Sequence, residues 1–411
     1  MTVVLALLAY LALPVIGWGV AVRREPPGVR IAVATAAGGL IVGIVMSAMS
    51  VLHIEWSRTV LLPVLALIAI ALNRWSAGRP RPAADGRGGR RYTWLVPWLF
   101  TVYGTITARE SCGDLQFTWG PKAIQFFRAG GLDPKVLHAY PQLTVDYPPL
   151  QTLLFAWSNT LSHQFSWWGA VLLGPLLFLL SIIVVREWSG NDHATLLYSA
   201  TMAWGYALAY PSGCAEPLLL LYETLAIVAL TFLDDDPRAQ TFYAALGLAG
   251  AAFTKLEGST FVIAVFLAIV IIQRNAKRAL IVIVPAAILV GAWMTFVFRN
   301  DLLYMYGGAR MPMYFSALPV VLKTLAKVAK FDLYWLPWLV PIVLVALGNV
   351  RRAAVPLAIA LLTSCATIYF YLHYPDPTWW IESSSPRVIL TPLLALLIAA
   401  AAAWRERTEL K

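Results

Sequence analysis

The sequence predicts an all-α membrane protein, a bundle of about 13 transmembrane helices. Of its 411 residues, 60% are hydrophobic and only 13% are charged, whereas soluble domains carry about 25% charged residues. The mean hydropathy is +0.71. The apolar residues fall in runs of about 17–22, the length that crosses a bilayer as a helix. A transmembrane β-barrel would show short segments of alternating polarity, which are not found here.

The apolar runs place the individual helices. We expect spans over residues 2–22, 30–52, 57–73, 92–108, 166–185, 194–211, 217–233, 239–254, 258–273, 279–298, 331–347, 354–373 and 387–404. The first run has no basic leader and no small-residue cleavage site, so we expect a retained span and not a signal peptide. Another run, 150–162, is too short to cross and predicts a re-entrant or interfacial helix.

Basic loops determine the predicted orientation. The linker 74–91 carries six arginines, and the positive-inside rule places it in the cytoplasm. If 150–162 does not cross the membrane, the basic loops that follow it also lie in the cytoplasm, whereas crossing would place them all outside. The positive-inside rule therefore favours the non-crossing arrangement, in which the N-terminus and residues 109–165 lie outside. The net charge of +10 follows from these loops and does not indicate a nucleic-acid partner. A bacterial inner membrane is the expected location, with the site facing outward.

We divide the chain into three parts. Residues 1–91 hold extra N-terminal helices and the basic cytoplasmic linker, and no role can be assigned to them. Residues 92–298 form the predicted core, with an outer loop of short interfacial helices over 109–165. Residues 299–411 form a C-terminal membrane region with outer loops 299–330 and 374–387.

The longest polar interval, 108–150, holds the main candidate site. Asp114, Trp119 and Lys122 follow the pattern D-x-x-x-x-W-x-x-K-A just past the outer end of a span. Asp114 is either a helix cap or solvated loop carboxylate, or a general base that takes a proton from a hydroxyl nucleophile. Glu110, four residues earlier, is the second candidate for this role.

The same interval ends in a rigid turn. Asp146 and Tyr147 precede the pair Pro148–Pro149, which fixes an extended backbone and suits the start of a helix. The turn is either a plain entry into the next helix or a support that holds both side chains at the mouth of the site.

Two further outer turns carry charged residues. Glu216 either stabilises the first turn of the helix that it opens or is a second site carboxylate. Lys255 and Glu257 interrupt two apolar runs in the segment TKLEG. Charges at membrane depth are costly unless they are paired or face a polar cavity, although Lys255 could also extend to the interface.

The C-terminal outer loops add basic and aromatic residues. Arg387 opens the final span, and an arginine fork suits phosphate. Trp379 and Trp380 could stack on a sugar, but tryptophans are common at membrane interfaces. Residues 318–330 predict an amphipathic helix on the membrane surface. Its lysines are Lys323, Lys327 and Lys330. The apolar residues expected opposite them are Leu318, Leu322 and Leu325.

An outer-loop acid followed by W-x-x-K-A, then YPPL and later TKLEG, resembles the C-type (GT-C fold) glycosyltransferases. The similar proteins are bacterial relatives of protein O-mannosyltransferases and aminoarabinose transferases, and the resemblance covers the chain from about residue 92 onward. It implies an inverting transfer from a polyprenyl-phosphate sugar without a nucleotide-sugar site. It also implies that Asp114 is catalytic and that Lys255 and Arg387 bind the donor phosphate. Family members often have Asp where this chain has Glu216.

The resulting hypothesis is a membrane glycosyltransferase with an Asp general base, acting on a glycan, lipid or protein acceptor. The alternatives are a lipid or polysaccharide transporter or flippase, and an O-antigen polymerase or ligase. The mid-span regions look apolar, which disfavours transport. The predicted catalytic residues are Asp114 and Glu216. The predicted substrate-binding residues are Glu110, Trp119, Lys122, Asp146, Tyr147, Lys255, Glu257 and Arg387.

The cysteines and histidines indicate no metal site, and we expect no cofactor. Three cysteines have no C-x-x-C spacing, and the five histidines have no metal-ligand spacing. Cys112 and Cys214 each lie two residues before an acidic candidate on the same predicted face. In an oxidising compartment they could form a disulfide between the two outer loops.

Overall fold

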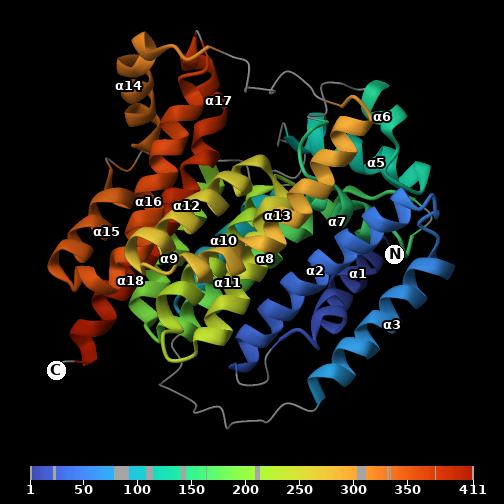
Figure 1. Ribbon diagram of the computed structural model, residues 1–411, viewed down its shortest axis with the longest axis horizontal. Helices are drawn as coiled ribbons and strands as arrows, with labels where there is room; N and C mark the ends of the chain where they lie inside the picture. Colours follow the sequence, from blue (N-terminus) through green and yellow to red (C-terminus); the bar gives the residue numbers. More distant parts are fainter. Residues whose placement is uncertain are drawn as a thin grey trace.

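The computed structural model describes residues 2–21, 25–77, 92–107, 114–139, 145–162, 164–208, 213–302, 312–330, 333, 335–374 and 376–409, and these residues form helices and turns without a strand (Figure 1). The helices are α1 (Thr2–Gly17), α2 (Pro27–Val51), α3 (Arg58–Ala77), α4 (Leu95–Thr107), η1 (Leu115–Trp119), α5 (Gly120–Ala129), α6 (Pro134–Ala139), α7 (Leu150–Ser158), α8 (Trp167–Ser189), α9 (Asp192–Leu208), α10 (Glu216–Phe232), α11 (Pro237–Thr254), α12 (Leu256–Ile272), α13 (Ala276–Arg299), η4 (Phe315–Ala317), α14 (Leu318–Ala329), α15 (Leu336–Leu347), α16 (Val350–Tyr371), α17 (Pro377–Val388) and α18 (Leu390–Glu409).

A helix occurs at each predicted span, and the short helices expected in the outer loop occur as η1, α5 and α6. Among the described residues, six helices are long and apolar enough to cross a membrane: α2, α3, α8, α13, α16 and the segment Pro377–Trp404, which joins α17 to α18. This confirms a helical protein with several helices suited to crossing a membrane. That all 13 predicted runs cross the bilayer stays a prediction.

Helix α10 lies at the centre of the bundle and packs against α8, α11 and α18 (Figure 1). Every residue from Glu216 to Thr231 is buried. A helix that is apolar on all sides is stable only when other helices surround it. Glu216 therefore stands at the end of a helix that the rest of the fold encloses, and other helix ends surround it.

The N-terminal helices are part of the same apolar core. The hydroxyl of Tyr222 in α10 donates to the carbonyl oxygen of Ala36 in α2 at 2.8 Å, and the indole of Trp157 in α7 donates to that of Ala9 in α1 at 2.9 Å. Buried polar groups are satisfied in this way when helices pack closely. The extra helices thus fix the positions of α7 and α10.

Helix α7 narrows the prediction for 150–162. It has nine residues, too few to cross a bilayer, as expected. All nine are buried, and α7 packs against α1, α2 and α5. Enclosure by other helices argues against the interfacial alternative and is compatible with the re-entrant one.

Helix α14 is amphipathic as predicted. Val321 and Thr324 are buried against the protein, whereas Leu322, of the predicted apolar face, is 46% exposed. The helix lies beside α17, to which the ion pair between Lys327 and Glu382 joins it at 2.8 Å (Figure 1). That α14 lies on a membrane surface stays a prediction.

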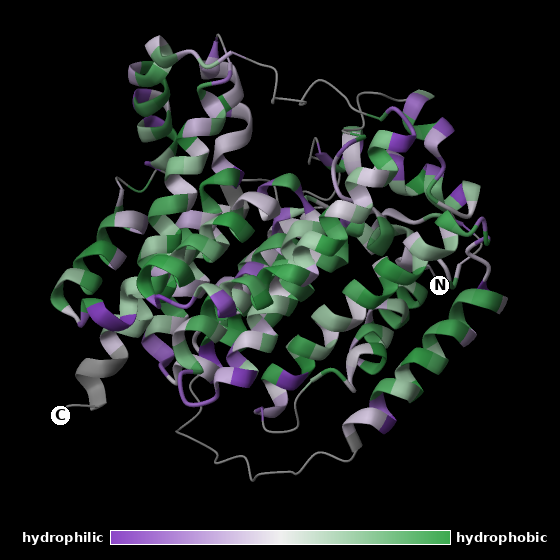
Figure 2. Ribbon diagram, in the orientation of Figure 1, coloured by the Kyte–Doolittle hydropathy of each residue, from purple (hydrophilic) through white to green (hydrophobic). Residues whose placement is uncertain are grey.

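Polar residues lie mainly at the ends of the helices and in their connections, whereas the helix bodies are apolar (Figure 2). This distribution is typical of a bundle whose helix bodies face lipid or one another. The functional groups of such a bundle gather where several helices end together.

The contact between α1 and α2 predicts a strong effect of Gly38→Ala. A Cβ at Gly38 would lie 2.0 Å from the carbonyl oxygen of Leu13, so the two helices would have to separate. We expect the free energy of unfolding to fall by about 1–3 kcal/mol, a typical result of overpacking. Thermal unfolding of the purified protein in detergent measures the change.

Gly291→Ala is the matched control, since nothing lies within 4 Å of a Cβ at Gly291 in α13. Alanine is the better helix former, so this variant should be unchanged or gain up to about 1 kcal/mol. Equal melting temperatures for the two variants would contradict the close contact at Gly38.

Candidate functional site

Five charged residues from four separate segments meet beside the N-terminal end of α10. They are Asp114 just before η1, Glu216 in α10, Lys255 and Glu257 at the start of α12, and Arg387 in α17. The sequence predicted each of them as a site residue. The structure brings all five together, although Asp114 and Arg387 are 273 positions apart.

The cluster is held by ion pairs. The ammonium of Lys255 lies 2.8 Å from Glu216 Oε1 and 2.8 Å from Glu257 Oε1. The guanidinium of Arg387 pairs with Asp114, and its Nε lies 4.0 Å from Glu216 Oε1. The side chains of Lys255 and Glu216 are only 8% and 4% exposed. Buried charges are stable only when paired in this manner.

The local backbone explains why these side chains point at one another. Lys255 is extended (φ −156°, ψ 157°) between α11 and α12, so the chain leaves one helix and enters the next at this residue. A Cβ at Gly258 would lie 1.9 Å from the carbonyl oxygen of Ala251. The glycine thus allows the first turn of α12 to pack against the end of α11, with Lys255 held between them.

The simpler roles considered for these residues do not account for all of their contacts. Asp114 precedes η1 but makes no side-chain capping bond, and its carboxylate pairs with Arg387. Glu216 lies in the first turn of α10, as the simpler role requires, and its carboxylate also pairs with Lys255. Lys255 is 6% exposed and does not extend to an interface. These residues therefore bind one another across helices.

An aromatic and polar group adjoins the charged cluster. The rings of Trp119 and Tyr147 meet edge to face with centroids 5.8 Å apart, and the Lys122 ammonium lies 5.4 Å from the Trp119 ring centroid. The indole of Trp293 donates to the backbone carbonyl of Asp146 at 2.8 Å. Tyr147 is close enough to Lys255 to act on it electrostatically, so the two groups form one continuous site.

Burial changes the pKa values of the opposing pair Lys122 and Asp146. Lys122 is 1% exposed, and burial lowers its pKa to about 7, against the attraction of Asp146. Burial also raises the pKa of Asp146, which Lys122 opposes. Both groups can therefore change protonation far more easily than their exposed counterparts, as groups at functional sites often do.

Several buried polar atoms around the cluster have no hydrogen-bond partner among the described residues. More than nine in ten buried polar groups in proteins are bonded, so a group of unbonded atoms in one region marks a site for a polar ligand or water. Both donors and acceptors are present. The atoms are Trp119 Nε1, Asp146 Oδ1, Gln151 Oε1, Thr152 Oγ1, Glu216 Oε2, Glu257 Oε2 and Ser385 Oγ.

Glu223 is a polar residue that the sequence reading missed. It is fully buried in α10, two turns below Glu216, and the hydroxyl of Thr391 in α18 lies 3.0 and 2.9 Å from its two carboxylate oxygens. The prediction of apolar mid-span regions is therefore wrong for the run 217–233. A single carboxylate within LLLLYETLAIVAL was the signal, since an ionisable residue in a span is rare without a role.

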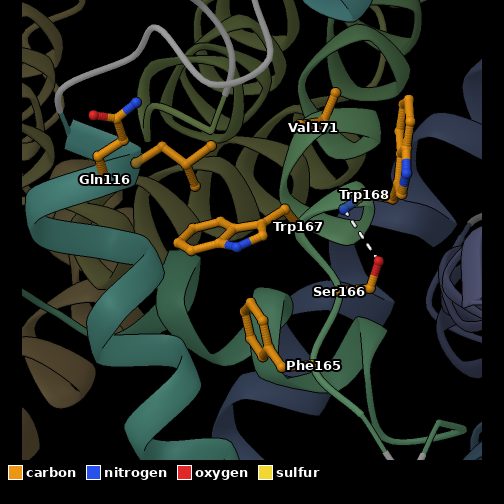
Figure 3. A pocket seen from close by; sticks show the side chains of 7 residues that line it. Gln116, Phe165, Ser166, Trp167, Trp168 and Val171 are labelled. Atoms are coloured by element: carbon orange, nitrogen blue, oxygen red, sulfur yellow. Dashed lines mark hydrogen bonds between the residues drawn. The ribbon is translucent and has the colours of Figure 1, made fainter.

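Two cavities lie beside this region. One, of about 490 Å³, begins at the residue after Asp114, and Figure 3 shows Phe165 and Trp167 lining it together with Gln116 from η1. Trp167 packs on the backbone at Gly120, where a Cβ would lie 2.1 Å from its ring. The other, of about 1160 Å³, lies between the ends of α2 and α13 and the α5–α6 turn. None of the predicted site residues lines either cavity.

Some predicted features lie elsewhere or outside the described residues. Glu110 and Cys112 are outside them, so the role of Glu110 and the disulfide with Cys214 stay predictions. Trp379 is 63% exposed and Trp380 stacks on Tyr374 at 4.6 Å, about two helical turns from Arg387. The tryptophan pair is not brought into the charged cluster.

One group in the described part of the chain has metal-ligand geometry. Ligand atoms of Asp114, Cys214 and Glu216 lie within 4.8 Å of one another. Both carboxylates already pair with a cation, Arg387 or Lys255. Those cations already occupy the carboxylate oxygens, so a metal ion could bind there only by displacing Arg387 or Lys255.

The comparisons with known proteins identify no relative. The sequence matches no protein-family model, and no curated protein and no solved structure is significantly similar to it. Function must therefore be inferred from the cluster and its surroundings.

The buried amine of Lys122 predicts a pH dependence of stability. Its pKa falls from 10.5 to about 7 on folding, so between these values the unfolded chain holds a proton that the folded chain has released. The free energy of unfolding should rise with pH through this window. Lys122→Met has no amine, so this rise with pH should be missing when its melting temperature is plotted against pH.

Lys135→Met is the control, since Lys135 is exposed at the start of α6 and should leave the pH profile unchanged. A Lys122→Met profile parallel to that of the unaltered protein above pH 7 would show that the amine is not buried as described.

Proposed function

We propose that the protein is an inverting membrane glycosyltransferase of the GT-C type. It would transfer a sugar from a polyprenyl-phosphate carrier to an acceptor hydroxyl at the outer face of a bacterial inner membrane. The observation that supports this most directly is the charged cluster: a carboxylate, Asp114, lies beside two cations, Lys255 and Arg387, at the meeting point of several helix ends. This is the set of groups that such a transfer requires.

The chemistry assigns one task to each group. The acceptor oxygen attacks the anomeric carbon, and the bond from that carbon to the phosphate oxygen breaks with its electron pair remaining on the phosphate. Asp114 takes the hydroxyl proton as general base. Lys255 and Arg387 stabilise the negative charge on the departing phosphate. Glu216 holds Lys255 in place at 2.8 Å.

The ion pairs indicate an order of events. Arg387 pairs with Asp114, so the carboxylate cannot act as a base until the guanidinium leaves it. A phosphate offers Arg387 a bidentate partner of comparable or greater strength. Donor binding would thus draw Arg387 away and release Asp114 to receive the acceptor proton.

A transporter is the second candidate, and Glu223 is the observation that favours it. Buried carboxylates within spans often line transport pathways. Here, however, one neighbouring hydroxyl contacts both oxygens of Glu223, whereas Glu216, at the end of α10, has a buried carboxylate oxygen without a hydrogen-bond partner among the described residues. The arrangement suits a site at one end of the bundle.

The proposal predicts that Asp114→Asn abolishes transfer. Loss of the base should lower turnover about 100-fold or more, because general-base catalysis contributes about 10²–10⁴. The measurement follows sugar transfer by purified protein supplied with lipid-linked sugar donors and a mixture of cell-envelope acceptors.

Asp133→Asn is the matched control. Asp133 is an outer-turn carboxylate that accepts a backbone bond from Lys135 at 2.9 Å, which an asparagine can also accept. Its turnover should stay normal. Full activity of Asp114→Asn would remove Asp114 from the role, and no transfer from any lipid-linked donor would count against the class.

The proposed exchange of Arg387 from Asp114 to a phosphate makes a second prediction, which a binding measurement can test without sugar transfer. Farnesyl phosphate, a short carrier without sugar, should bind more tightly to Asp114→Asn, because the neutral amide competes less for Arg387. Arg387→Gln should bind it at least several-fold more weakly, since a hydrogen bond to a charged group contributes about 1.5–3 kcal/mol. Calorimetric titration in detergent measures both affinities.

Lys323→Gln, which changes an exposed lysine on α14, controls for nonspecific charge effects and should not alter the affinity. Weaker binding to Asp114→Asn would contradict the competition between carboxylate and phosphate.

A further inference from the structure

The last two helices meet beside the charged cluster at a single turn residue, Ile389, which we call the break, although the bonds from the Ile389 amide to the Ser385 carbonyl and from the Leu393 amide to the Ile389 carbonyl continue across it. Helix α17 ends at Val388 and α18 begins at Leu390. Pro386 and Pro392 lie on either side of the junction. A proline has no amide hydrogen and its ring clashes with the carbonyl four residues earlier, so helical bonding is weakened both before and after the break.

The two sides of the break belong to different apolar clusters. Ile381 of α17 packs with Val321 of α14 and Tyr371 of α16 in a small cluster of its own. Leu390 and Leu393 of α18 are in the main core. The boundary between the clusters therefore coincides with the point at which the helix is weakest.

Each side of the break is tied to α10 by one polar residue. On the α17 side, Arg387 pairs with Asp114 and lies 4.0 Å from Glu216. On the α18 side, one turn later, the Thr391 hydroxyl contacts both oxygens of Glu223 at 3.0 and 2.9 Å. The second contact is the deeper one, because Glu223 lies two turns below Glu216 in α10.

The burial of Glu223 shows that this second contact is not incidental. The residue is 0% exposed, and no ion pair to it occurs among the described residues. A carboxylate within a membrane helix is costly, and an apolar side chain would pack there without that cost. Its presence opposite a single hydroxyl points to a role in positioning α18 against α10.

We infer that Glu223 and Thr391 are positioning residues that anchor α18 to α10, so that α17 above the break carries Arg387 to Asp114. The contact between Glu223 and Thr391, which we call the anchor, holds the start of α18 in place, while Arg387 in α17 can leave Asp114 for another partner. The identity of the second partner as a phosphate rests on the proposed function, but the anchoring does not.

The test measures how strongly Asp114 and Arg387 interact when the anchor is present or broken. Asp114→Asn, Arg387→Gln and the double variant are compared by melting temperature in three backgrounds: unaltered, Thr391→Val and Thr391→Ser. Valine keeps the shape of threonine and removes the hydroxyl, whereas serine keeps the hydroxyl. A double-mutant cycle isolates the interaction of the pair.

We expect the effects of the two substitutions to be non-additive in the unaltered and Thr391→Ser proteins and additive in Thr391→Val. Non-additivity of equal size in Thr391→Val would overturn the inference. No substrate is needed, so the result stands even if the protein transfers no sugar.

Substitutions of Glu223 and a binding measurement give a second, independent test. Glu223→Gln keeps an oxygen acceptor for Thr391 and should behave as the unaltered protein, whereas Glu223→Leu should behave as Thr391→Val. Thr391→Val should weaken farnesyl phosphate binding several-fold, but only while Arg387 is present. A lower melting temperature with unchanged affinity and an unchanged cycle would reduce the contact to ordinary packing and refute the positioning role.

Discussion

The structure depends on the pairing of two buried cations with three carboxylates at the end of α10. Lys255 and Arg387 could not be enclosed by apolar helices without Glu216, Glu257 and Asp114, because an isolated buried charge is strongly destabilising. The pairing in turn requires that the ends of four segments stand together. The close helix contacts at Gly38 and Gly258 serve this requirement, since they leave no room for displacement.

The same pairing sets the chemical character of the site. Three carboxylates outnumber two cations, so the cluster has no cation to spare for an anionic ligand until an existing pair opens. Arg387 is the residue best placed to change partner, because it lies on α17, which packs with α14 and α16 apart from the main core. Lys255 is held between two carboxylates and two helices. A firmly held cation and one better placed to change partner thus both lie beside Glu216 Oε1.

The depth of the polar groups is the observation that favours the proposed transferase over a transporter. Seven of the thirteen buried atoms without a hydrogen-bond partner among the described residues belong to the site that includes Trp119, Asp146 and Glu216. Glu223 extends the polar region two turns inward but contacts Thr391 with both oxygens. A continuous path of ligand groups through the membrane would need further such residues. In α10, the residues that follow Glu223 as far as Thr231 are uncharged and buried.

Hydropathy alone determined the helices, because a bilayer imposes a length and an apolar composition that can be counted along the chain. Loop charges assigned helix ends to one face, and this placed Asp114, Glu216, Lys255 and Arg387 near one another before any contact was known. Only the tertiary structure decided their partners. The pairing of Arg387 with Asp114, the burial of α7, the exposed side of Leu322 and the contact between Glu223 and Thr391 all depend on how each helix is rotated against its neighbours. Rotation depends on side-chain packing between segments distant in sequence, and within uniformly apolar helices the order of residues carries little information about it.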